Sequence, residues 1–128
     1  AAFTGAITSS APTGGGIGYA TGAGGAVTQI TNRSTGVTLS KLTGAITTDT
    51  TSLAGLATAT FTVTNTTVAI GDTIILSQRS GAAQPTTICQ VSAVAAGSFN
   101  ITVINTHTTN AETGAIVLNF AVIKAVSA

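Results

Sequence analysis

The side chains that could carry out acid–base or metal chemistry are few in this sequence. It has one histidine, His107, one cysteine, Cys89, and three carboxylates, Asp49, Asp72 and Glu112. A zinc site in a protein generally takes three or four ligands, and a nucleophilic residue needs a base held by an orienting group. Only His107 and Glu112 lie near each other along the chain. We therefore expect a non-enzymatic protein with no catalytic residue, no metal and no cofactor.

Each of these side chains also has an ordinary structural interpretation. Cys89 lies in the apolar run 88–91, which is typical of a buried and unreactive thiol. Asp49 and Asp72 stand beside turn residues, where carboxylates accept hydrogen bonds from the turn. His107 lies in the polar stretch 105–110, which we interpret as an exposed hairpin loop. The alternative for His107 is a metal ion shared by several copies across a symmetry axis.

Two further patterns could indicate binding. The glycine-rich stretch 14–18 has no Lys-Ser or Lys-Thr ending and no strand before it, so it does not predict a nucleotide site. Thr60, Thr62 and Thr64 form a row of the kind that binds ice or sugars in some proteins. The sequence does not show the row repeated on neighbouring strands, and threonine is a common residue on strand surfaces.

Charge is scarce along the whole chain. Charged residues make up 5% of it, against roughly 25% in an ordinary soluble domain. A formal net charge of +1 gives no basic patch for nucleic acid. No run of about 18 apolar residues is present, so we expect no membrane span. A surface this poor in charge predicts contact with other protein copies.

The elements that must position these residues have the pattern of strands. Residues 60–64 and 99–103 alternate apolar and polar side chains, which is the period of a half-buried strand and places Phe61 in the core. Cys89, Val91 and Ala93 share one face of a strand that forms a hairpin with residues 99–103 through a turn at 96–98. Residues 49–56 are the one candidate for a short helix or turn. Short strands with no helical period predict an all-β fold, an antiparallel β-sandwich of jelly-roll type. The expected strands are 26–31, 36–39, 45–48, 60–64, 72–77, 87–95, 99–103 and 116–126.

The last of these strands is apolar on both faces. Phe120 belongs to one apolar row and Ile123 to the other. A strand that is apolar on both sides is expected to be covered on both sides. We therefore predict that Phe120 or Ile123 lies near a subunit contact.

Residues 1–25 differ from the β-domain, which we expect to cover residues 26–128. The segment is rich in glycine and polar residues and contains four isolated large side chains, Phe3, Ile7, Ile17 and Tyr19. Ordering so much glycine costs more than four apolar side chains return, so the segment cannot fold alone. We interpret it as an extended arm whose large side chains contact a neighbour; a disordered tail is the alternative.

Three stretches of the sequence, 16–29, 34–47 and 117–128, resemble a small family of structural proteins from tailed bacteriophages and prophages. Its members are placed among capsid decoration, cement or head-fibre proteins. The resemblance implies a virion protein, made in the cytoplasm of the host bacterium and located on the capsid surface. Its partners would be the major capsid protein and copies of itself, as a homo-oligomer that we expect to be a trimer. Residues 1–15 and the loop 78–85 fit the family pattern least.

The rival interpretation is a carbohydrate- or host-binding module of a fibre or adhesin. Such a module is expected to show clustered exposed aromatic side chains with polar partners. The chain has one tyrosine and no tryptophan. The composition therefore favours the structural interpretation.

Overall fold

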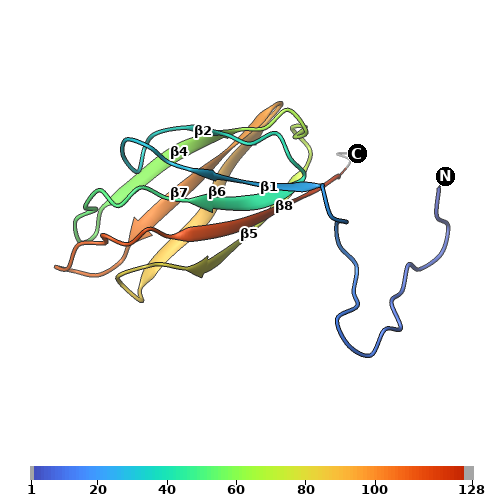
Figure 1. Ribbon diagram of the computed structural model, residues 1–128. Helices are drawn as coiled ribbons and strands as arrows, with labels where there is room; N and C mark the ends of the chain where they lie inside the picture. The colour runs from blue at the N-terminus through green and yellow to red at the C-terminus, as the bar shows by residue number, and fades with distance from the viewer. Residues whose placement is uncertain (1, 126–128) are drawn as a thin grey trace.

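The computed structural model describes residues 2–125, and its folded part is a sandwich of two four-stranded β-sheets (Figure 1). No helix that could cross a membrane is present among these residues. The first sheet has the strand order β1, β3, β8, β5, with bounds Gly24–Thr28, Thr43–Thr47, Val117–Ile123 and Thr73–Ser80. The second has the order β2, β4, β7, β6, with bounds Val37–Thr38, Thr58–Thr64, Ser98–Asn105 and Thr87–Ala95. The prediction of a β-sandwich is confirmed.

Both sheets are mixed: their other strand pairs are antiparallel, as predicted, but the pair at one edge of each sheet is parallel. β1 pairs with β3 in parallel, and β2 pairs with β4 in parallel. The chain alternates between the sheets over its first four strands, because β1 and β3 lie in the first sheet while β2 and β4 lie in the second. The jelly-roll topology stays a prediction.

The core follows from the alternation of side chains along the central strands, since successive residues point to opposite faces of a sheet. In β4, Ala59, Phe61 and Val63 are buried while the threonines between them are exposed. Phe61 is 2% exposed and pairs in register with the buried Ile101 of β7. The predicted burial of Phe61 is confirmed.

Phe120 belongs to this core and not to a subunit contact. β8 is an inner strand of the first sheet, and its burial pattern shows that the row Leu118, Phe120 and Val122 faces the core. Phe120 is 2% exposed, and its ring lies 5.4 Å from that of Phe99 at 57°. The prediction of an interface role for Phe120 is therefore wrong. Ile123 points the other way and is 47% exposed.

The hairpin of β6 and β7 is present, with Gly97 at its turn in the left-handed region, φ +80°. The pairing register shifts between Val91 and Ala93. Such a bulge adds one residue to a strand and reverses the faces beyond it. Cys89 and Val91 thus pack on the core, but Val94 takes the place that we predicted for Ala93, which is exposed.

Residues 49–56 form no helix. Leu53 instead makes an isolated antiparallel bridge with Glu112, and its side chain is buried. This bridge ties the segment before β4 to the segment before β8. The strand expected over 116–126 ends at Ile123, and Val126 lies outside the described residues.

Candidate functional site

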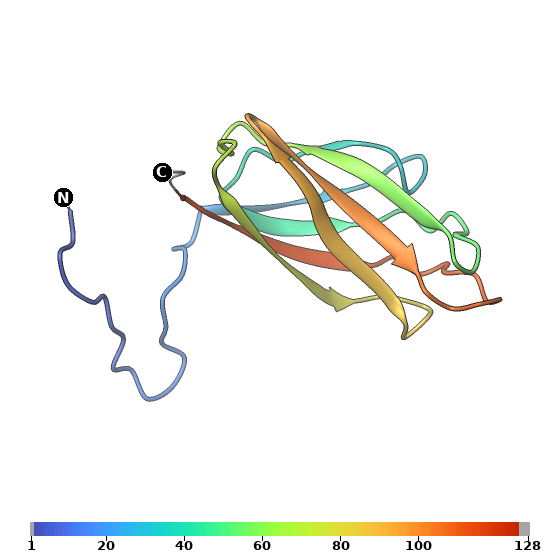
Figure 2. The same cartoon turned by 180° about the vertical axis from the view of Figure 1, so that it is seen from behind.

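The feature most open to a partner is the amino-terminal arm, residues 2–23, which precedes β1 and contains no strand or helix. The arm leaves the sandwich at the end where β1 begins and β8 finishes, and it extends well away from the sheets (Figures 1 and 2). Phe3, Ile7 and Ile17 are 76%, 55% and 75% exposed. These large apolar side chains are therefore left largely in contact with water in the single chain.

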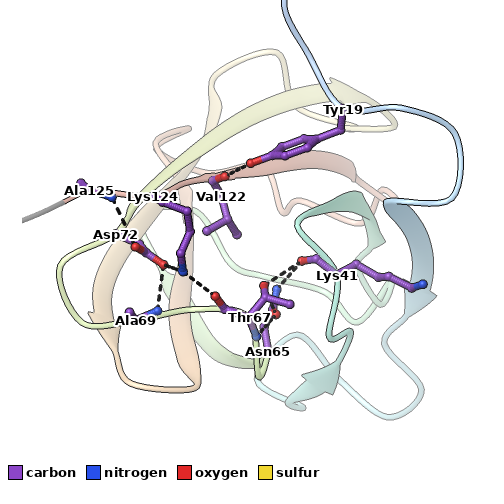
Figure 3. Close-up of polar contacts among 9 residues, drawn as sticks. All are labelled: Tyr19, Lys41, Asn65, Thr67, Ala69, Asp72, Val122, Lys124 and Ala125. Carbon is purple, nitrogen blue, oxygen red and sulfur yellow. Dashed lines mark hydrogen bonds and ion pairs between the residues drawn. The ribbon is translucent and has the colours of Figure 1, made fainter. Parts of the chain in front are cut away.

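Tyr19 is the point at which the arm is fixed to the sandwich. Its hydroxyl donates a hydrogen bond to the backbone carbonyl of Val122, near the end of β8 (Figure 3). Among the described residues, none from 2 to 18 makes a hydrogen bond to the sandwich. The arm is therefore divided into an anchored base at Tyr19 and a free outer part.

An ion pair holds the strand end that receives Tyr19. The Lys124 ammonium group pairs with the buried Asp72 carboxylate and donates to the carbonyl of Thr67 at 2.7 Å (Figure 3). Asp72 also accepts from the backbone N–H groups of Ala69, at 2.8 Å, and Ala125, at 3.4 Å. The hydrogen bond from Ala69 and the contact with Lys124 lower the pKa of Asp72. These contacts join the last strand to the turn before β5 and fix the base of the arm.

A polar turn lies beside this ion pair. The Asn65 side chain is fully buried and donates to the carbonyl of Lys41 at 2.7 Å. Thr67 donates from its hydroxyl to Asn65 Oδ1 at 2.7 Å, and the Thr67 N–H donates to the same oxygen at 3.0 Å. The Asn65 amide thus hydrogen-bonds to backbone groups of two loops, at Lys41 and at Thr67, and holds these loops together at this end of the sandwich.

Glu112 is buried at the opposite end, in the segment before β8. Its carboxylate accepts hydrogen bonds from the N–H groups of Ala83 at 2.8 Å, Gln84 at 2.9 Å and Gly114 at 2.6 Å, and from the Thr87 hydroxyl at 2.6 Å. Burial acts to raise the pKa of Glu112, but these hydrogen bonds favour the anion and bring the pKa below its ordinary value. The carboxylate thus holds two loops together, and each of its oxygens accepts two hydrogen bonds.

Arg33 reinforces the same end of the molecule. Its guanidinium donates to the carbonyl oxygens of Thr51 at 2.6 Å, Gly114 at 2.9 Å and Glu112 at 3.3 Å, and to the Thr48 hydroxyl at 3.2 Å. Burial lowers the pKa of Arg33. Sequence reasoning missed the roles of Arg33 and Glu112. The one signal in the sequence was that charged residues are rare, and this does not identify the groups that Arg33 and Glu112 contact.

The remaining titratable side chains also have structural roles. The prediction of an exposed hairpin loop at His107 is wrong, because the side chain is partly buried and the loop connects β7 and β8, which lie in different sheets. Its Nδ1 accepts from the N–H groups of Thr109 at 3.1 Å and Asn110 at 2.9 Å. Asp49 accepts from the Thr51 N–H at 2.7 Å, which confirms its predicted turn role. Burial raises the pKa of the Cys89 thiol to about 11. Over residues 2–125, no group of three His, Cys, Asp or Glu side chains is placed to hold a metal ion.

The outer face of the second sheet continues the threonine row of β4 onto its neighbours. The hydroxyls of Thr60 and Thr102 lie 2.8 Å apart, and Thr102 donates to Ser92 at 2.9 Å. Thr62 donates to Asn100 at 2.9 Å. The structure therefore supplies the repetition across β4, β7 and β6 that the sequence could not show. The result is an uncharged hydroxyl-rich face whose groups already bond one another.

The predicted interface residues do not form one patch. Tyr19 lies against the end of β8, in which Ile123 follows Val122, while Phe3, Ile7 and Ile17 lie outward along the arm. No protein-family model, curated protein or solved structure matches this chain. The functional argument therefore depends on the residues of the chain itself.

Proposed function

We propose that this chain is a non-enzymatic virion structural protein that decorates and cements a phage capsid as a homo-oligomer, with the arm contacting a neighbour. The observation that carries the proposal is the arm, which has a fixed base at Tyr19 and exposed Phe3, Ile7 and Ile17. An extended segment with apolar side chains on one side is a form in which proteins bind a partner by strand addition. The trimer remains the expected oligomer.

The treatment of charge supports the same proposal. Asp72, Glu112 and Arg33 are buried and bonded to loops of the same chain. The outer faces of the sheets carry hydroxyl and apolar side chains, among them the exposed Ile75, Ile88 and Ile123, and little charge. Copies can therefore lie close together without repulsion between like charges. A protein that binds only the assembled shell shifts the equilibrium toward the shell, which is how it would cement the capsid.

A carbohydrate-binding module is the second candidate, and the hydroxyl-rich face of β4, β7 and β6 favours it. Thr60, Thr102 and Ser92 could exchange their mutual hydrogen bonds for those of a sugar. Sugar sites usually add an aromatic side chain, and the one tyrosine of the chain lies on the arm. Glycan binding that is lost on Thr60→Val and Thr102→Val, with the arm intact, would favour this candidate.

Removing the free part of the arm tests the main proposal. A variant without residues 1–18 keeps Tyr19 and every described hydrogen bond of the sandwich. We expect it to fold, to sediment as a smaller species than the full chain at micromolar concentration, and to bind capsids more weakly in co-sedimentation. A matched variant with Ile70→Ser removes an exposed isoleucine of a turn and should behave as the full chain does. A full chain that sediments as a monomer and leaves capsids unoccupied would contradict the proposal.

A further inference from the structure

One flank of the sandwich leaves the core incompletely covered. β5 and β6 are the last strands of their sheets and lie next to each other. Inward side chains on the inner strands, such as Val103 and Leu118, are fully buried. Those of the two edge strands pack on the core but stay partly exposed; they are Ile74, Leu76, Cys89, Val91 and Val94.

On the other flank a side chain of the same chain packs on the edge, although Val27, Leu39 and Leu42 there are also partly exposed. There β1 and β2 are the edge strands, and Leu39 lies over the glycines beside them. A Cβ at Gly25 would come within 2.9 Å of Leu39, and one at Gly44 within 2.8 Å. The two glycines thus make room for the Leu39 side chain on that flank, whereas the β5–β6 flank has the longer row of partly exposed apolar side chains.

The edge of β5 is fit to accept another strand. A strand at the edge of a sheet has unpaired N–H and C=O groups along its outer side. From Thr73 to Gln78, β5 keeps regular register with β8 and contains no proline and no charge. The register shifts after Gln78, where Arg79 adds a charge. β6 is less suitable because its bulge interrupts the edge after Val91.

The outer part of the arm has the pattern of a strand that would fit this edge. Residues 3–11 are free of proline and charge, and Pro12 ends the stretch. In an extended strand Phe3 and Ile7 point to the same side, with Gly5 between them, while Thr4, Ala6 and Thr8 point to the other. A strand with these two faces would place Phe3 and Ile7 on the core and hydroxyls outward; β5 itself turns Ile74 and Leu76 inward and Thr73, Ile75 and Ser77 outward.

The segment between the anchor and this strand gives the arm its reach. Residues 12–18 include three consecutive glycines, Gly14 to Gly16, and Gly14 has a positive φ of +66°. Seven extended residues span up to roughly 24 Å. That length allows residues 3–11 to lie along a neighbouring molecule while Tyr19 stays on its own.

We propose that residues 3–11 of one copy add as a strand to the free edge of β5 in a second copy, where Phe3 and Ile7 cover the β5–β6 flank. This inference rests on the proposed function, because it names the surface that the arm contacts in the homo-oligomer. Edge addition satisfies the backbone groups of both partners, and the alternate side chains give the fit. Both segments are uncharged, so neither ion pairing nor repulsion opposes the contact.

Cys89 reports on the flank directly, because it is the only cysteine and is partly exposed there. The full chain would be treated with N-ethylmaleimide at fixed pH over a range of protein concentrations. As the oligomer forms, we expect modification of Cys89 to slow at least tenfold and the backbone amides of residues 73–78 to gain protection from hydrogen exchange. The double variant Phe3→Ser, Ile7→Ser should lose both effects. The matched variant Ile30→Ser, which changes an exposed residue that follows β1 and lies outside the arm, should keep them.

Three results would overturn the inference, and they separate it from the proposed function. If the full chain assembles but Cys89 and the β5 amides react at the same rate at every concentration, the arm binds elsewhere and only the inference fails. If protection depends on Phe3 and Ile7 but not on concentration, the arm covers its own flank, and the second copy is excluded as occupant. If the full chain neither assembles nor binds capsids, both proposals fail.

Discussion

Replacing Glu112 by glutamine should cost much of the stability of the sandwich, although the two side chains have nearly the same shape. The carboxylate accepts hydrogen bonds from three backbone N–H groups and from the Thr87 hydroxyl, two on each oxygen. Glutamine keeps one accepting oxygen and presents an NH2 group in place of the other. Whichever way the amide is turned, its NH2 group therefore faces two of the four hydrogen-bond donors.

The cost can be worked from these contacts. Turning the amide nitrogen toward Thr87 is the less harmful choice, because a hydroxyl can rotate to accept a hydrogen bond, but the Gln84 N–H then stays unpaired. A buried unpaired donor costs about 1–3 kcal/mol. The hydrogen bonds that remain lose their charge, and neutral ones are about half as strong. Together these losses predict a decrease of about 2–4 kcal/mol in the free energy of unfolding.

Urea unfolding followed by circular dichroism measures this loss. With a slope of roughly 2 kcal/mol per molar urea, the midpoint of Glu112→Gln should fall by about 1–2 M. Asp49→Asn is a matched control, because Asp49 is partly exposed and asparagine can still accept from the Thr51 N–H. The control should shift the midpoint much less. A Glu112→Gln midpoint equal to that of the control would refute the structural role of the carboxylate.

The pH dependence gives an independent check of the same carboxylate. The folded pKa of Glu112 lies below its ordinary value, so below about pH 4.3 the unfolded chain binds more protons than the folded one. The contribution of Glu112 to stability is therefore present above that pH and is lost as the pH falls through the folded pKa. Glu112→Gln should lose less stability between pH 5 and pH 2 than the wild type does. Identical acid profiles for the two proteins would contradict the assignment.

Three further changes test the core, a loop and the absence of site chemistry. Phe61→Ala should destabilise the fold by about 3–5 kcal/mol in urea unfolding, as large truncations do in packed cores, and a loss below about 1 kcal/mol would contradict the burial. Gly81→Ala should cost about 2 kcal/mol or more by the same measurement, because φ is +89° and a Cβ would lie 1.9 Å from the Ala115 oxygen; an unchanged midpoint would count against this loop conformation. His107→Ala with Cys89→Ser, and separately the addition of a chelator, should leave oligomer size and capsid binding unchanged in sedimentation, whereas dissociation in chelator would indicate a shared metal.

The strands that were predicted best are those whose own side-chain pattern shows which face is buried. β4 and β7 alternate strictly because one face of each is buried and the other meets water. Their pattern alone predicts Phe61 in the core and the hairpin of β6 and β7. The parallel edge pairs were not predicted, because β2 has two residues and its direction depends on how the chain crosses between sheets. Local pattern carries no information about such crossovers.

The errors in placing single residues have the same cause. Phe120 and Ile123 both belong to apolar rows, and the sequence does not say which row faces the partner sheet. The pairing register decides it, because Leu118 pairs with the buried Ile46 of β3 and Phe120 with Leu76 of β5. The bulge after Val91 is a similar case, since one extra residue reverses the face of Ala93 without a mark in the sequence. Glu112 was missed because its four donors come from segments before and after it that only the fold brings together.

The central claim, that this protein cements a capsid, is tested most directly by heating capsids with and without it. Phage capsids that lack the protein would be mixed with the full chain or with the variant lacking residues 1–18, and rupture would be followed by the exposure of packaged DNA to a dye. We predict that the full chain raises the rupture temperature and that the shortened chain raises it less. An equal rupture temperature in the presence and absence of the full chain, at full occupancy of the capsid, would contradict the claim.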